Sequence, residues 1–139
     1  MKRKRYRLCM TGILFALIIA LSGCSMSSLD TTKLRDLEFT VVSEERLPEE
    51  LKTLIEERKT GDFKLTYNDN EFLYICIGYG EQATGGYSIA VNDLYLTEEA
   101  ITISTSLLGP GPEDRIGSAP SYPYIVVKTE YLDKTVTFE

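Results

Sequence analysis

The fold of this chain is decided by residues 78–87, GYGEQATGGY, which join an apolar run to an alternating one. Four of the chain's ten glycines fall within these ten residues. Glycine reaches backbone conformations with positive φ, and it lets another backbone approach closely, without steric cost. We therefore predict a shaped loop between two strands.

Two interpretations of this loop are open. In the first, Gly85 and Gly86 only turn a hairpin, and Tyr79 and Tyr87 are core aromatics. In the second, the loop also binds a partner, because tyrosine rings beside a glycine turn offer rigid contact area with a polar tip. No residue of the loop is a nucleophile paired with a base, so recognition suits it better than catalysis.

Strand patterns lie on both sides of the loop. Residues 72–77, FLYICI, are apolar on both faces, as in a strand that is covered on both sides of a sheet. Period-two alternation predicts further strands at residues 37–41, 63–67, 87–96, 101–107, 124–129 and 135–138. The last two are expected to pair through a turn at Asp133 and Lys134.

One helix is predicted over residues 48–60. Pro48 opens it, acidic residues occupy its first turn and basic residues its last. Leu51, Leu54 and Ile55 share one face and are expected to pack on the sheet. The expected fold is mainly β: a small antiparallel β-sandwich or open barrel of about seven strands, with this helix packed against it.

The first 24 residues have the features of a bacterial lipoprotein leader. Five basic residues precede an apolar core of 14 residues, and Leu21-Ser22-Gly23 precedes Cys24. In such leaders the chain is cut before a lipidated cysteine, and two acyl chains give stable membrane anchoring. We expect residues 1–23 to be a signal peptide, residues 24–36 to be lipidated Cys24 with a flexible tether, and residues 37–139 to be one β domain.

An uncleaved transmembrane helix is the alternative to the lipoprotein leader. The apolar run is shorter than the roughly 20 residues that span a bilayer core. Both interpretations place the domain at the cell membrane, facing outside the cytoplasm.

Charge limits the classes of partner. The chain has 15 basic and 21 acidic residues, and five basic residues but no acidic one lie in the first 23, so residues 24–139 carry a net charge of −11. Such a surface repels the phosphates of nucleic acid and of anionic lipid. We therefore expect no nucleic-acid partner.

The sequence also lacks the residues of common catalytic and metal sites. It has no histidine, which excludes the usual triads and most zinc sites. Cys76 falls in the buried strand and is expected to be an inert packing residue rather than a nucleophile. Residues 68–71, NDNE, lack the spacing of a calcium loop and are predicted to form a hairpin turn. We expect no catalytic residue, no metal and no small-molecule cofactor, hence no enzyme.

A second loop, residues 108–123, contains four of the five prolines. Its length indicates either function or disorder. Both loops precede a strand that opens with a tyrosine, so we expect them at the same end of the domain. Tyr122 is the expected exposed anchor, and Tyr87 should be partly buried. Gly85→Val should damage the loop if Gly85 has positive φ. The candidate partner-binding residues are Gln82, Thr84, Gly85, Gly86, Tyr87, Tyr122 and Pro123.

Residues 78–91, GYGEQATGGYSIAV, and residues 120–128, PSYPYIVVK, resemble the PrcB C-terminal domain family. The resemblance spans roughly residues 37–139. The family is named after a lipoprotein subunit of a bacterial surface protease complex, and it usually has proline where this chain has Ala83. The resemblance implies a non-enzymatic surface lipoprotein, an interaction or accessory module that assists or stabilises an exported or surface protease.

A protease inhibitor is the alternative function. Residues 82–87, QATGGY, are similar to the Asn-Pro-Thr-Thr-Gly-Tyr wedge loop of chagasin-like cysteine-protease inhibitors, which are also β-sandwiches. This chain has an inserted Gly86 and lacks the asparagine and the proline of that loop.

Overall fold

The computed structural model of the chain describes residues 31–139. The predicted signal peptide, Cys24 and the first part of the predicted tether lie outside the described residues, so the expectations for them stay predictions. Over residues 31–139, no helix is long and apolar enough to cross a bilayer.

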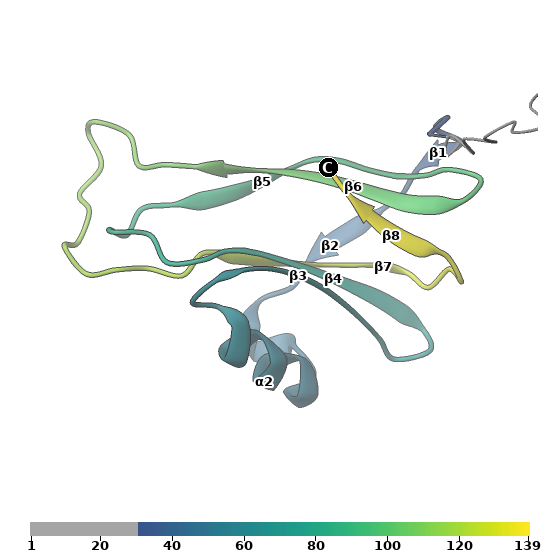
Figure 1. Cartoon of the computed structure of the whole chain (residues 1–139), viewed down its shortest axis with the longest axis horizontal. Helices are drawn as coiled ribbons and strands as arrows, with labels where there is room; N and C mark the ends of the chain where they lie inside the picture. The colour runs from purple at the N-terminus through teal and green to yellow at the C-terminus, as the bar shows by residue number, and fades with distance from the viewer. Residues whose placement is uncertain (1–30) are drawn as a thin grey trace, which may run out of the picture.

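Within the described residues, eight strands form two sheets that lie face to face (Figure 1). Sheet A has the strand order β1 (Arg35–Asp36), β5 (Ser88–Leu96), β6 (Ala100–Leu108) and β8 (Thr135–Phe138). Sheet B has the order β2 (Phe39–Val41), β7 (Tyr124–Glu130), β4 (Phe72–Tyr79) and β3 (Asp62–Asn68). The predicted mainly β sandwich is confirmed, with one strand more than expected.

The additional strand is β1. It is two residues long and lies within residues 24–36, which were predicted to be a flexible tether. It pairs with Tyr95 and Leu96 of β5. At Leu37 the chain crosses to sheet B, where β2 pairs with β7. One short segment therefore supplies an edge strand to each sheet.

The predicted hairpin between residues 124–129 and residues 135–138 is wrong. β7 lies between β2 and β4, so both of its edges are already paired. β8 pairs in parallel with β6 instead, with Thr135 opposite Ala100. The other strand pairs are antiparallel, as expected.

The hydrophobic core is built around β4, which is buried on both faces, as its continuous apolar sequence predicted. Leu73, Ile75 and Ile77 point into the layer between the sheets. Tyr74 and Cys76 point to the other face of sheet B, beneath the helix. The layer between the sheets is completed by Leu37, Leu94, Ile101, Ile103, Ile125 and Val127.

The predicted helix is present as α2 (Glu49–Arg58). Leu51 and Ile55 are 0% and 1% exposed and pack on the outer face of sheet B. Leu54, which the sequence grouped with them, is only half-buried. The reason is geometric: residues four apart stack along one line of a helix, and Leu54 lies beside the line that Leu51 and Ile55 form. A short 3₁₀ helix, η2 (Glu44–Arg46), precedes α2.

The acidic hairpin turn at residues 68–71 is confirmed. Asp69 Oδ1 accepts the backbone N–H groups of Glu71 at 3.1 Å and of Phe72 at 2.7 Å. These bonds stabilise the carboxylate and lower the pKa of Asp69. Asn70 takes a positive φ of 70°, which asparagine tolerates in turns.

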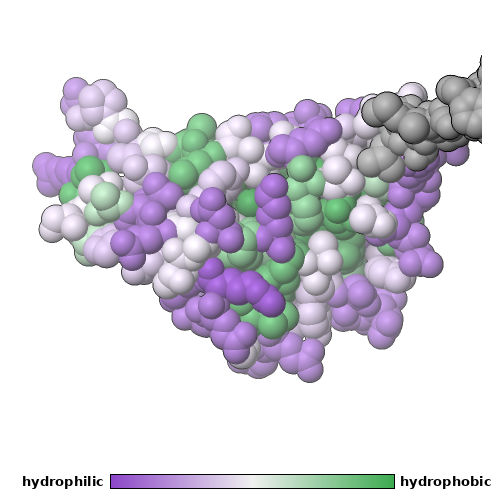
Figure 2. Space-filling view, in the orientation of Figure 1, coloured by the Kyte–Doolittle hydropathy of each residue, from purple (hydrophilic) through white to green (hydrophobic). Residues whose placement is uncertain are grey.

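One side of the sandwich is closed by β8. Figure 2 shows apolar surface between β8 and β3, and mostly hydrophilic surface over α2. Leu132, Val136 and Phe138 pack there against the core. Lys64 Nζ lies 5.4 Å from the centre of the Phe138 ring and so covers part of this apolar surface.

Candidate functional site

The two predicted loops lie side by side at one end of the sandwich (Figure 1). The backbone N–H of Gln82 donates to the carbonyl of Ser121 at 2.8 Å, and the N–H of Ser121 donates to the carbonyl of Gln82 at 3.0 Å. The expectation that the loops share one end is therefore confirmed. We call residues 80–87 and 109–123 together the loop surface.

Further hydrogen bonds fix the two loops to each other and to β4. Ser121 Oγ donates to the carbonyl of Thr84 at 2.6 Å, and Gln82 Nε2 donates to the carbonyl of Tyr79 at 3.0 Å. The carbonyl of Pro123 accepts the N–H of Tyr79 at 3.0 Å. Gln82, Thr84 and Pro123 are half-buried and have structural contacts, and their partner-binding roles stay predictions.

Gly86, not Gly85, has positive φ, so the condition under which Gly85→Val was expected to damage the loop is not met. The φ of Gly86 is +85°, and a Cβ there would lie 2.8 Å from Ile116 Cγ2 and 2.9 Å from Pro110 Cβ. At Gly85 no atom lies within 4 Å of the place of a Cβ, and φ is not in the left-handed region. Glycine is needed at position 86 because Pro110 and Ile116 of the second loop occupy the place of a Cβ.

Tyr122 is half-buried, which corrects the expectation of a freely exposed anchor. Its hydroxyl donates to Glu81 Oε2 at 2.9 Å, and Lys59 Nζ lies 5.8 Å from the centre of its ring. The hydrogen bond to Glu81 is the main cause of the raised pKa of Tyr122. Tyr122 thus connects the loop surface to the residue that follows α2, partly through a cation–π contact.

Tyr87 is half-buried, as expected, and its Cε1 lies 3.6 Å from the place of a Cβ at Gly109. Two exposed apolar side chains at this end were not predicted from the sequence: Leu108 (49% exposed) and Ile116 (45% exposed). Ile116 is the one large apolar residue within residues 109–120, GPGPEDRIGSAP. That isolation among prolines, glycines and charges is the signal that could have indicated it.

The loop surface combines polar and apolar groups. It presents backbone groups, an exposed Ile116 and Tyr122, whose hydroxyl bonds to Glu81 and whose ring lies beside Lys59, the residue after α2. Within residues 31–139, no group of three metal-ligating side chains is found. Cys76 lies away from the loops inside β4, and burial raises the pKa of its thiol to about 12.

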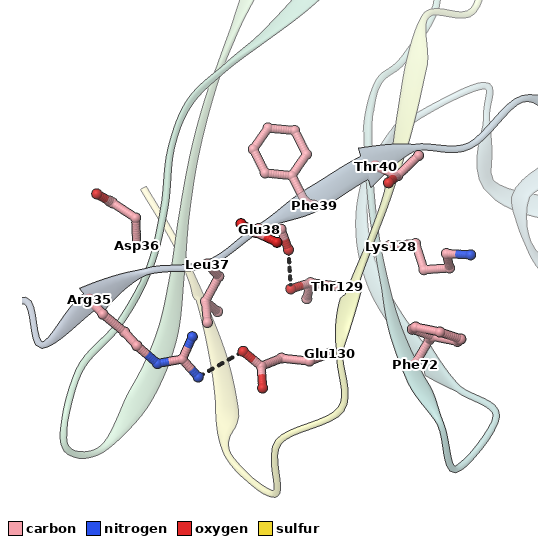
Figure 3. A pocket seen from close by; sticks show the side chains of 10 residues that line it. All are labelled: Arg35, Asp36, Leu37, Glu38, Phe39, Thr40, Phe72, Lys128, Thr129 and Glu130. Carbon is pink, nitrogen blue, oxygen red and sulfur yellow. Dashed lines mark hydrogen bonds and ion pairs between the residues drawn. The ribbon is translucent and has the colours of Figure 1, made fainter.

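A second candidate site is the hollow where the chain crosses from β1 to β2 (Figure 3). Its volume is about 830 Å³, and it is lined by residues 35–40, Phe72 and residues 128–130. Arg35 Nη2 donates to Glu130 Oε1 at 2.7 Å. Thr129 Oγ1 donates to the carbonyl of Glu38 at 2.7 Å. These two bonds tie the crossing segment to β7.

Residues 73–130 match a protein family described as PrcB C-terminal. The match runs from β4 to β7, so it includes both loops, but it is narrower than the span of residues 37–139 in which the resemblance was expected. The resemblance is confirmed over this region, and it points to an accessory, protease-complex-associated module. Neither a curated protein nor a solved structure matches the chain.

Proposed function

From this resemblance we propose that the chain is a non-enzymatic surface lipoprotein whose domain binds an exported protease through the loop surface and assists or stabilises it. The accessory character of the PrcB C-terminal family supports this role. The leader that ends at Cys24 supports a lipid anchor in the cell membrane, with the domain facing outside the cytoplasm. The net charge of −11 favours a partner with a basic surface.

The observation that carries this proposal is that each loop holds the other. The Gln82–Ser121 bridge and the contact of Gly86 with Ile116 fix both backbones before any partner arrives. A surface that is already ordered loses little conformational entropy on binding. Ile116 remains 45% exposed on this ordered surface, as an apolar contact for a partner.

Photocrosslinking in the native cells tests the proposal. A photoreactive amino acid replaces Ile116 of the full chain, and in a second protein it replaces Tyr131, which is 41% exposed beyond the far end of β7. We expect an exported protease to be crosslinked from Ile116 and not from Tyr131. Absence of a protease, or equal crosslinking from both positions, would refute the loop surface as its binding site.

The activity of the captured protease separates assistance from inhibition. Adding the purified full chain in detergent should prolong the active lifetime of that protease. Slower cleavage of a peptide substrate would instead support the chagasin-like alternative, in which residues 82–87 block the protease.

A further inference from the structure

The edge of sheet A beside β5 is mostly unoccupied. β5 runs from Ser88 to Leu96, but β1 pairs only with Tyr95 and Leu96. The chain then leaves sheet A at Leu37 to form β2. Within residues 31–139, no strand therefore pairs with this edge of β5 over residues 88–93. On the opposite side of the sandwich, β8 pairs with β6 over residues 100–103.

The backbone of β5 presents hydrogen-bonding groups to this edge. The N–H of Leu34 donates to the carbonyl of Leu96 at 2.7 Å, and the N–H of Leu37 donates to the carbonyl of Leu94 at 3.0 Å. Leu94 and Leu96 have side chains in the layer between the sheets. In β5, residues with inward side chains therefore direct their backbone groups to this edge.

Ile89 and Val91 extend the same row. Their side chains also pack against the core between the sheets. The pairing with β6 shifts by one residue between Val91 and Asp93. Because of this bulge, the side chains of Val91 before it and of Leu94 after it both face the core, although they are three residues apart. The N–H and C=O groups of Ile89 and Val91 therefore point to the unoccupied strand position.

Apolar side chains lie next to that position. Phe39 and Val41 belong to β2, the edge strand of sheet B on the same side of the sandwich, and Val41 is opposite the inward-facing Val127. Phe39 is nevertheless 41% exposed and Val41 56% exposed. Figure 3 shows Phe39 pointing along this side, between the green strands of sheet A and the yellow strand β7.

We propose that an extended segment of a partner protein adds to sheet A at this position, in line with β1. Its backbone pairs with Ile89 and Val91, and its inward side chains cover Phe39 and Val41. Strand addition of this kind gains affinity from backbone hydrogen bonds and specificity from alternate side chains. The site is distinct from the loop surface, because it uses the lateral edge of the sandwich.

Charge and chain direction identify the occupant as a partner segment. Thr31 lies beside Thr97, at the end of β5 far from Ser88, so the residues before it would have to reverse direction to fill the position. A second copy would bring two domains of net charge −11 together edge to edge. Near the gap, the two carboxylates of Asp36 and Asp93 share one cation, Lys33. We therefore expect the partner segment to carry a Lys or Arg where it lies beside these two carboxylates.

A synthetic peptide tests the proposal on the full chain in detergent. The probe is Lys-Val-Thr-Val-Thr-Val-Thr-Val-Lys, which alternates apolar and polar residues. We expect it to slow amide hydrogen exchange of Ile89 and Val91 at least tenfold and to leave Gly86 unchanged. The same peptide with N-methyl groups on its valines should not bind, because it cannot form the backbone ladder. Absence of binding, or binding without slower exchange at Ile89 and Val91, would overturn the proposal.

Matched variants test the apolar contacts. Phe39→Lys and Tyr131→Lys each place a charge at a position that is 41% exposed, but only Phe39 adjoins the gap. Phe39→Lys should weaken peptide binding at least tenfold and Tyr131→Lys should not; Val41→Lys is the second test if Phe39→Lys unfolds. Equal affinity of the variants would overturn the proposal, as would a dimer in which Ile89 and Val91 are protected without peptide. These outcomes do not bear on the proposed protease-binding function, because the crosslinking from Ile116 tests that function separately.

Discussion

Gly85 and Gly86 are adjacent and chemically identical, yet their environments give them different tolerances. Gly86 has a φ of +85° and faces Ile116 and Pro110, whereas no atom lies within 4 Å of the place of a Cβ at Gly85. Gly86→Ala should therefore lower the free energy of unfolding by about 1–3 kcal/mol through backbone strain and overlap. Gly85→Ala should change it by no more than about 0.5 kcal/mol. Denaturant midpoints of the two variants measure this, and equal midpoints would contradict the different roles of the two residues.

Tyr122 combines a structural contact with a candidate binding contact. Tyr122→Phe removes the hydrogen bond to Glu81 but keeps the ring beside Lys59, so stability and protease capture should change little. Tyr122→Ala removes the ring and should weaken capture by about 1–3 kcal/mol. Titration of the captured protease with each variant tests this. Full affinity in Tyr122→Ala would remove Tyr122 from the binding site.

Cys76 gives the protein a specific response to alkaline pH. Burial raises the pKa of its thiol from 9.0 to about 12 in the folded state. Between these values only the unfolded chain loses the proton, so the stabilisation is present below pH 9 and is lost as pH rises. From pH 8 to pH 10 the free energy of unfolding should fall by about 1.4 kcal/mol from this residue. Denaturant titrations should show a fall that is smaller by about this amount in Cys76→Ala, because the raised pKa values of Tyr74 and Tyr124 contribute to the fall in both proteins. An equal fall in both proteins would contradict the prediction.

At the scale of elements, α2 depends on two side chains. Leu51→Ala should cost about 2–5 kcal/mol, because Leu51 is fully buried against sheet B. Leu54→Ala should cost clearly less, because Leu54 is half-buried, and Lys59→Ala should cost little. Thermal or denaturant unfolding of the three variants measures this order. A Leu54→Ala protein as unstable as Leu51→Ala would mean that the helix docks through a different face.

The sequence predicted most strands and the helix because their patterns are local. The continuous apolar run in β4 and the alternation in β3 and β7 report burial directly. The partner of β8 was not predictable in this way, because it depends on whether β2 already occupies the edge of β7. β1 could not be predicted, since Arg35 and Asp36 have no apolar side chain.

The existence of the two loops was predictable from local sequence, but the contacts between them were not. The glycines and prolines indicated two shaped loops, and the tyrosines that follow them indicated a common end. Which glycine has positive φ depends on Ile116 and Pro110, which lie more than 20 residues away in the sequence. The bond from Tyr122 to Glu81 likewise forms only when both loops are in place.

At the scale of the whole molecule, the domain has two distinct ends. The loop surface precedes β5 and β7 at one end. The described part of the chain begins at the other end, where the N–H of Leu34 donates to the carbonyl of Leu96 and β1 lies (Figure 1). β5 has nine residues, so the two ends are separated by about 30 Å. An anchor at Cys24 would therefore hold the loop surface on the side away from the membrane.

This arrangement can be tested in vesicles that carry the mature lipoprotein. A fluorophore is attached at Glu98, in the turn between β5 and β6, or at Ile116, in the loop surface. A quencher on the lipid head groups should reduce the Glu98 signal more than the Ile116 signal, because Glu98 lies at the same end as β1. Equal quenching would mean that the domain has no preferred orientation on its tether.

The anchor itself is tested by Cys24→Ala. Without the thiol no acyl chain can be attached and the cut before the lipidated cysteine should not occur, so the variant should keep residues 1–23, which the mass of its amino terminus would show. Mass spectrometry of the wild-type amino terminus should then show Cys24 with at least two acyl chains, since one chain gives only reversible membrane binding. A Cys24→Ala protein that is cut normally and stays with the membrane, or a wild-type chain that keeps residues 1–23, would contradict lipidation of Cys24. In the second case the uncleaved apolar leader would be the anchor.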